Sequence, residues 1–235
     1  MSFTPVALVF GVGKNIGAGV AAAFAAKGYK IATISRAATL PQVSHNQSLH
    51  IQCDLSDPSG VSAVFERVRK ELGQPSVVVY NAYGHSHSDK INPLSIPLET
   101  AQSDLNTNAL SALAAAQEAV KSFDALDGKG ARTFISTGNI LNNQIILPPL
   151  LSLGVGKSAA AYIIQSAADA YKDRGFKFYY ADERTGEGKP VYNAIDGAAH
   201  GDFYVELSEG KEQGHWLATF VKGKGYVDFT GKHTL

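Results

Sequence analysis

The sequence has little of what marks secreted, membrane-spanning or nucleic-acid-binding proteins. Its 235 residues include one cysteine, Cys53, so no intrachain disulfide can form, which is typical of a reducing compartment. Lysine plus arginine and aspartate plus glutamate number 21 each, a balance that favours neither nucleic acid nor an anionic membrane as a partner. The N-terminus has no signal-peptide pattern, and no apolar run approaches the length of a membrane span. The sequence therefore predicts a soluble, cytoplasmic protein that binds neither nucleic acid nor membrane.

Hydrophobic residues make up 45% of the chain, an ordinary share for a globular protein with one sizeable core. Apolar runs rich in β-forming residues predict strands at 6–10, 30–35, 49–53, 76–80, 132–135 and 176–181. Helical patterns between them predict helices at 19–26, 58–72, 98–123 and 157–173. This alternation predicts a parallel sheet with helices on both faces, in a single domain over residues 1–235. The last fifty residues are turn-rich, so we expect a variable C-terminal region from about residue 182, with one strand near 226–229.

The stretch from residue 6 to residue 21, VALVFGVGKNIGAGVA, joins a buried strand to a helix through a glycine-rich turn. Gly11, Gly13 and Gly17 allow the backbone to turn tightly and to approach a ligand closely. The N-terminus of the following helix offers free N–H groups and a partial positive charge, which suit a pyrophosphate. This context favours a dinucleotide-binding site over the alternative, a strand–helix joint without a ligand.

The spacing of these glycines resembles the TGxxxGxG pattern of the short-chain dehydrogenase/reductase family, with Phe10 in place of the threonine and Asn15 in place of the middle glycine. Asparagine is the residue that best replaces glycine at positive φ, so we expect Asn15 to preserve the turn. The resemblance implies an α/β fold of Rossmann type, a doubly wound parallel sheet in three α/β/α layers. It also implies cofactor contacts at Gly11, Gly13, Lys14, Asn15, Ile16 and Gly17, of which Gly17 is predicted to approach the pyrophosphate most closely.

Two later segments resemble the same family and add cofactor contacts. Asp54 and Leu55 follow the third predicted strand, where the family has its adenine-contacting aspartate. Asn81 and Ala82 begin a segment similar to the family's NAG motif, which supports the sheet and lines the cofactor. Taken alone, Asp54 has an alternative as a cap or turn residue, and the Asn81 segment has one as a strand-end turn.

The resemblance also implies a set of catalytic residues. Asn108 lies where a helix asparagine of the family holds a structural water beside the catalytic lysine, and Lys157 matches the lysine of the YxxxK signature. Ser136 and Thr137 lie where the catalytic serine usually falls, and Thr137 would keep a hydroxyl there. The alternatives are a surface asparagine on a helix and strand-end hydroxyls that satisfy the backbone.

The charges near the end of the second predicted strand distinguish between the two nicotinamide cofactors. A free ribose 2′-hydroxyl is usually bound by an acid at this place, but this chain has Ser35 and Arg36 there. Lys14 adds a second cation from the glycine turn. Two cations without a carboxylate suit a 2′-phosphate, so the sequence favours NADP(H) over NAD(H), unless both cations are only solvated surface charges.

Two departures from the family concern the reactive half of the site. Leu153 stands four residues before Lys157, where the family has the tyrosine that donates a proton to the carbonyl oxygen, and leucine has no proton to give. Residues 181–183, Ala-Asp-Glu, stand where the family has the Pro-Gly that holds the nicotinamide. One interpretation is an NADP-dependent oxidoreductase with an altered active site, acting on a small molecule such as an iminium ion that needs no proton donor. The alternatives are a non-redox catalyst such as a cyclase, and a non-catalytic cofactor-binding sensor or partner protein.

The remaining candidates bear on metal binding and assembly. His85 and His87 have the spacing of a metal-ligand pair, but no third ligand is identifiable, so a loop that rims the substrate cleft is the better interpretation and no metal is expected. Members of the family are commonly dimers or tetramers through their long helices. The alanine-dense helices predicted at 98–123 and 157–173 would allow such packing, so we expect a homo-oligomer.

Overall fold

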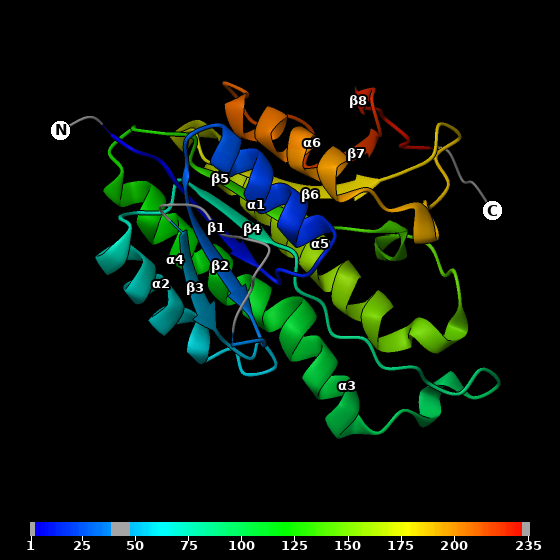
Figure 1. Ribbon diagram of the computed structural model, residues 1–235. Helices are drawn as coiled ribbons and strands as arrows, with labels where there is room; N and C mark the ends of the chain where they lie inside the picture. The colour runs from blue at the N-terminus through cyan, green and yellow to red at the C-terminus, as the bar shows by residue number, and fades with distance from the viewer. Residues whose placement is uncertain (1–2, 39–47, 232–235) are drawn as a thin grey trace.

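One sheet runs through the centre of the computed structural model, which describes residues 3–38 and 48–231 (Figure 1). The strand order is β3-β2-β1-β4-β5-β6-β7-β8, parallel throughout except for β8, which pairs antiparallel with β7. The strands are β1 (Val6–Phe10), β2 (Lys30–Ser35), β3 (Ser48–Gln52), β4 (Val77–Tyr80), β5 (Thr133–Thr137), β6 (Lys177–Glu183), β7 (Leu217–Val221) and β8 (Gly225–Tyr226). The order reverses between β1 and β4, which makes this point the topological switch of a doubly wound sheet.

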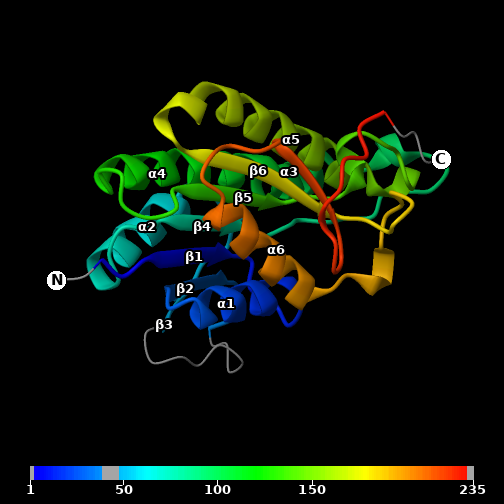
Figure 2. The ribbon, with the colours of Figure 1, turned by 90° about the horizontal axis from the view of Figure 1, so that it is seen from above.

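Helices cover both faces of the sheet (Figure 2). On one face lie α1 (Ile16–Ala26) and α6 (Gly197–Glu209); on the other lie α2 (Gly60–Glu71), α3 (Leu98–Leu105), α4 (Ser111–Ala125) and α5 (Leu151–Tyr171). The predicted three-layer Rossmann-like α/β fold is confirmed. None of the helices within residues 3–38 and 48–231 is long and apolar enough to cross a bilayer.

Alternate side chains of the central strands enter two separate hydrophobic cores, as the period of a β-strand requires. On β1, Leu8 and Phe10 pack in the core under α2, α4 and α5, where Phe10 meets the ring of Phe65 at 5.9 Å between centroids. Val9, between them in sequence, packs in the opposite core with Phe24 of α1. Burial on both faces explains why these strands read as continuous apolar runs.

The predicted elements agree with the structure through most of the chain, with shifts at their ends. The long helix expected at 98–123 is α3 and α4, joined by a π-helical turn at Asn106–Leu110. Helix α5 begins at Leu151, six residues before the predicted start at 157, so Leu153 and Lys157 lie on the same helix.

The prediction for the last fifty residues was wrong in two places. Helix α6 was not expected, and neither was β7; the predicted strand near 226–229 is reduced to Gly225–Tyr226. Helix α6 lacks a strong apolar period because part of its contact with α1 is made by glycines. A Cβ at Gly19 would lie 2.1 Å from the carbonyl oxygen of Gly197, and one at Gly201 would lie 2.7 Å from that of Gly19. Close contact of backbones leaves no pattern of large apolar side chains for a sequence reader to find.

Candidate active site

The glycine turn after β1 is fixed by hydrogen bonds from both neighbouring strands. The N–H groups of Gly11 and Val12 donate to the carbonyl oxygen of Ile34 at the end of β2, at 2.9 and 3.0 Å. On the other side, Asn81 Nδ2 donates to the carbonyl oxygen of Gly11 at 2.8 Å. Gly11 has a φ of +79°, and a Cβ there would lie 2.4 Å from Ala82 Cα, so no other residue fits. Asn81 and Ala82 therefore hold the turn in shape.

The other two glycines of the turn have different surroundings. Gly17 is buried in α1, and a Cβ there would lie 2.6 Å from Val12 Cα, so the packing of the turn itself requires glycine. Gly13 is exposed, and no atom lies within 4 Å of the place where its Cβ would be. Open space therefore lies above Gly13, next to the N-terminus of α1.

Asn15 does not take the conformation that its glycine-like position led us to expect. Its φ is −105°, so it is not in the left-handed region, and that expectation was wrong. Its side chain instead reaches the segment before α6: Oδ1 accepts from the N–H of Gly197 at 2.8 Å, and Nδ2 donates to the carbonyl oxygen of Ile195 at 3.0 Å. The residue that interrupts the glycine pattern thereby connects the turn to α6.

The predicted contacts of the adenosine half lie at the carboxyl ends of β2 and β3. Lys14 and Arg36 are exposed, and Arg36 follows β2 two residues after Ile34, whose carbonyl oxygen anchors the glycine turn. Ser35 is half-buried, and its hydroxyl donates to the carbonyl oxygen of Ala37 at 3.3 Å.

Asp54 and Leu55 follow β3 and have structural roles in this structure. Asp54 is exposed, and its Oδ1 accepts from the N–H of Ser56 at 3.0 Å, the turn role named as the alternative. Leu55 is buried, and its carbonyl oxygen accepts from the hydroxyl of Ser111 at 2.7 Å. Both residues still border the end of the sheet where the glycine turn lies.

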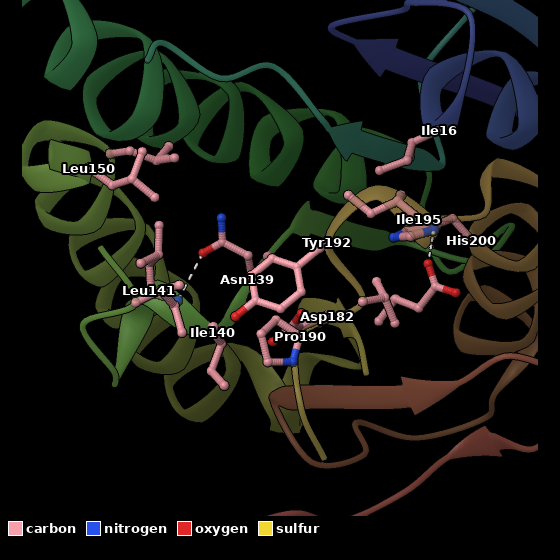
Figure 3. Close-up of a pocket in the computed structure, with 15 residues that line it drawn as sticks. Ile16, Asn139, Ile140, Leu141, Leu150, Asp182, Pro190, Tyr192, Ile195 and His200 are labelled. Carbon is pink, nitrogen blue, oxygen red and sulfur yellow. Dashed lines mark hydrogen bonds and ion pairs between the residues drawn. The ribbon is translucent and has the colours of Figure 1, made fainter. Parts of the chain in front are cut away.

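A cavity of about 200 Å³ opens beside the glycine turn, at the carboxyl ends of β5 and β6 (Figure 3). Apolar side chains form most of its wall, with five ionisable or amide side chains among them. In Figure 3, Ile140, Leu141 and Leu150 lie at one end and Ile16, Ile195 and His200 at the other, with Asn139 and Tyr192 between them. Ile16 is the first residue of α1, so the cavity begins next to the end of the glycine turn.

The predicted hydroxyls do not line this cavity. Thr137 is buried, and its Oγ1 accepts a hydrogen bond from the hydroxyl of Tyr204 at 2.9 Å. Ser136 is buried within β5 as well. The polar side chain that the end of β5 presents to the cavity is Asn139, whose Oδ1 accepts from the N–H of Leu141 at 3.0 Å.

Lys157 lies behind the cavity wall rather than in it. Its Nζ donates to the carbonyl oxygen of Thr137 at 2.7 Å, and its side chain is almost fully buried. Burial lowers the pKa of Lys157 to about 8, and the negative charge of Asp182 works against this shift. Leu153, one helical turn earlier on α5, is the residue that reaches the cavity.

Asn108 stabilises the contact between the π turn and the loop after β4. Its Nδ2 donates to the carbonyl oxygen of Gly84 at 2.7 Å, and its Oδ1 accepts from the N–H of the same residue at 3.1 Å. It also packs on Gly156 of α5, where a Cβ would lie 2.4 Å from the Asn108 side chain. Asn108 thus places α5, and with it Lys157, against the end of β5.

Four charged or ionisable side chains gather at the end of β6, where the sequence analysis noted only the missing Pro-Gly. Asp182 pairs with Arg184 at 2.5 Å, and both side chains are buried. Burial raises the pKa of Asp182 to about 6, although the charges of Arg184 and Lys157 oppose the shift. Glu183 lies 3.5 Å from Nδ1 of His200 on α6, and both of these side chains are buried at the cavity wall.

His85 and His87 lie in the exposed loop after β4, with ring centroids 4.3 Å apart. Within the described parts of the chain, no group of three histidine, cysteine, aspartate or glutamate side chains is placed to hold a metal ion.

Comparison with known proteins identifies the family. A family model described as short chain dehydrogenase matches residues 5–180. The chain belongs to the short-chain dehydrogenase/reductase family. It is 46% identical over 240 residues to a short chain dehydrogenase/reductase, dmxR12, of Cryptosporiopsis sp. (strain 8999), in a match that covers 96% of this chain and 95% of the relative.

Solved structures of other proteins share the fold. The NADPH-dependent 3-quinuclidinone reductase of Rhodotorula rubra has a TM-score of 0.75 at 21% identity, covering 94% of this chain and 91% of that one. An NADH-dependent reductase, A1-R′, complexed with NAD, has a TM-score of 0.79 at 13% identity, covering 94% and 95%.

Residues that sequence reasoning missed lie mostly in the C-terminal part of this short-chain dehydrogenase/reductase. Tyr192 and His200 line the cavity but come from the region read as turn-rich. Glu183 was noted only as an interruption of the Pro-Gly motif. A run of three charged residues, Asp182–Glu183–Arg184, at the end of a strand was the signal that a buried charge cluster follows β6.

Proposed function

We propose that this chain is an NADP(H)-dependent oxidoreductase whose catalytic group differs from that of its family and whose substrate is a small, largely apolar molecule. The observation that carries the proposal is the cavity at the ends of β5 and β6, which is continuous with the start of α1 through Ile16. An open α/β sheet binds ligands at this edge, at the switch point between β1 and β4.

The glycine turn and the end of β2 fit the phosphates of the cofactor. The space above Gly13 admits the pyrophosphate, and the N-terminus of α1 stabilises its charge. Lys14 and Arg36, both exposed, supply cations for a 2′-phosphate, and Arg36 can bind it with two parallel hydrogen bonds. The bound cofactor would supply or accept a hydride in the cavity.

The substrate end of the cavity is apolar and has no strong proton donor on α5. Leu153 takes the place where the family's tyrosine would stand, and Ile140, Leu141 and Leu150 line the same cavity. Loss of a positioned general acid lowers a rate by roughly 10²–10⁴-fold, so ordinary ketone reduction should be poor. A substrate that needs no proton at its accepting atom, such as a cyclic iminium ion, avoids this loss. The cavity then contributes mainly by orienting the substrate.

Calorimetric titration with NADPH and NADH tests the cofactor part of the proposal. We expect NADPH to bind more tightly, and Arg36→Ala to remove most of the preference, because a charge-assisted phosphate contact is worth about 1.5–3 kcal/mol. Lys129→Ala is the matched control, because Lys129 is exposed and precedes the amino end of β5, whereas Arg36 follows the carboxyl end of β2. Equal binding of the two cofactors, or a preference unchanged in Arg36→Ala, contradicts the assignment.

A substrate panel tests the chemistry. With NADPH in excess, we expect the protein to reduce preformed cyclic iminium salts faster than simple ketones and aldehydes. Rapid ketone reduction would show that another group in the cavity supplies the proton. Cofactor binding without turnover of any panel member would favour the non-redox or sensor alternatives.

A further inference from the structure

Glu183 and His200 form a buried acid–imidazole pair that the proposed chemistry does not use. Their side chains are each 3% exposed, and Oε2 of Glu183 lies 3.5 Å from Nδ1 of His200. The same Nδ1–H donates to the carbonyl oxygen of Asp196 at 2.8 Å, so His200 is fixed with its other ring edge toward the cavity (Figure 3). Glu183 Oε2 is fixed in turn, because it accepts from the N–H of Asp196 at 2.9 Å.

The negative charge of Glu183 has no buried cation to balance it among the described side chains. Its neighbour Asp182 is paired with Arg184, whereas the carboxylate of Glu183 lies beside the imidazole of His200. Burial lowers the pKa of His200, so the imidazole carries no charge at neutral pH. The ammonium of Lys222 is exposed and bound to Asp196. A buried carboxylate without a cationic partner is costly, and a cation in the cavity would reduce that cost.

The place of Glu183 in the cavity is the one that the nicotinamide ring would reach, if the proposed cofactor binds. A pyrophosphate at the start of α1 leaves one half of the dinucleotide over β2 and β3 and directs the other half toward β4, β5 and β6. The first part of the cavity on that path is the end formed by Ile16, Ile195 and His200 (Figure 3). Glu183 lies at this end, 3.5 Å from His200. The ring is a pyridinium cation in the oxidised cofactor and neutral in the reduced one.

We propose that Glu183, held by the N–H of Asp196 and packed beside His200, makes this site bind the oxidised cofactor in preference to the reduced one. The buried carboxylate attracts the pyridinium ring, and the neutral dihydropyridine ring gains no such attraction. The inference rests on the proposed function, since it requires that the nicotinamide cofactor binds. Preferential binding of the oxidised form lowers the reduction potential of the bound couple, so Glu183 favours transfer of a hydride from the cofactor to the substrate.

The test measures dissociation constants of both redox forms by calorimetry without substrate, at one neutral pH. We expect the parent protein to bind NADP⁺ more tightly than NADPH. Glu183→Gln should lower the ratio of the Kd for NADPH to the Kd for NADP⁺ about tenfold, which for a two-electron couple is a shift of about 30 mV in the potential of the bound cofactor. Asp202→Asn is the control, because it removes an exposed carboxylate from the same helix as His200 and should leave the ratio unchanged.

The outcomes separate the inference from the function on which it rests. If neither redox form binds the parent, the proposed function fails. If both bind and the ratio is the same in the parent and Glu183→Gln, the cofactor site stands and the role of Glu183 is overturned. Should Glu183→Gln not fold, the parent alone decides, since tighter binding of NADPH than of NADP⁺ contradicts a carboxylate that favours the cationic ring.

Discussion

Asn15 and Gly197, 182 positions apart in the chain, are joined by a hydrogen bond of 2.8 Å from the N–H of Gly197 to Asn15 Oδ1. A second hydrogen bond runs from Asn15 Nδ2 to the carbonyl oxygen of Ile195, so both ends of the Asn15 amide bind the segment before α6. The glycine turn and the start of α6 are therefore one unit. A change at Asn15 should affect both the proposed phosphate site and the cavity wall at Ile195.

Removing this contact should weaken both folding and cofactor binding. Asn15→Ala deletes two hydrogen bonds at a partly exposed site, so we expect the free energy of unfolding to fall by about 1–2 kcal/mol. Denaturant titration followed by circular dichroism measures this, and calorimetry measures the accompanying loss of cofactor affinity. Asn143→Ala, at an exposed position, is the control, and equal stability of the two variants would contradict the coupling of the turn to α6.

The two glycines with different surroundings should separate binding from folding. Gly13→Val places its side chain in open space, so we expect the free energy of unfolding to stay within about 0.5 kcal/mol while cofactor affinity falls at least about tenfold. Gly17→Ala drives a Cβ into Val12, so we expect a loss of about 1–3 kcal/mol in stability. If Gly13→Val binds the cofactor as the parent does, the phosphate does not lie above Gly13.

A proton donor introduced on α5 should recover ketone reduction. Leu153→Tyr puts a phenol into the wall of the cavity. We expect the rate of ketone reduction to rise by at least about tenfold, below the roughly 10²–10⁴-fold that a fully positioned acid provides. Leu153→Phe is the matched control, because it adds the same ring without the hydroxyl. An equal gain in both variants would show that ring packing, and not proton donation, limits the rate.

The buried ammonium of Lys157 makes stability depend on pH above neutrality. Its pKa is lowered from 10.5 to about 8 by burial, so between these values the unfolded chain binds a proton that the folded chain does not. The free energy of unfolding therefore rises from pH 7.5 to 9.5, by on the order of 1–2 kcal/mol for this lysine, and below pH 8 the contribution levels off.

Lys157→Met should reduce this rise, as denaturant titrations at several pH values can measure. Part of the rise should remain, because burial also lowers the pKa of Lys177 to about 8. Parallel pH profiles for the parent and Lys157→Met would mean that the ammonium is not buried as described.

We propose further that the protein is a homo-oligomer formed through the outer faces of α4 and α5. Leu113 and Tyr162 are exposed on these two helices, at 36% and 73%, so a second copy packed on these helices would cover apolar surface. We expect a dimer or tetramer by light scattering coupled to size exclusion, and a monomer for Leu113→Asp/Tyr162→Asp. Lys211→Asp, at an exposed position after α6, is the control; a monomeric parent contradicts the proposal.

The amino-acid sequence by itself determined the first six strands of the sheet and the glycine turn after β1. The apolar run Val6–Phe10, the glycines after it and the alternation of strands and helices are local patterns, and each is fixed by residues within a few positions of one another. The cations Lys14 and Arg36 could also be placed from the sequence, because each adjoins a strand or turn whose position was already clear.

Only the tertiary structure decided how the reactive half of the site is built. Nothing near Asn15 in sequence shows that its amide binds the segment before α6, and nothing near Thr137 shows that its hydroxyl is bonded to Tyr204. The Glu183–His200 pair likewise joins a strand to a helix that the sequence did not predict. These contacts depend on the distance and direction between elements far apart in the chain, which packing of α6 on α1 sets and which no local periodicity records.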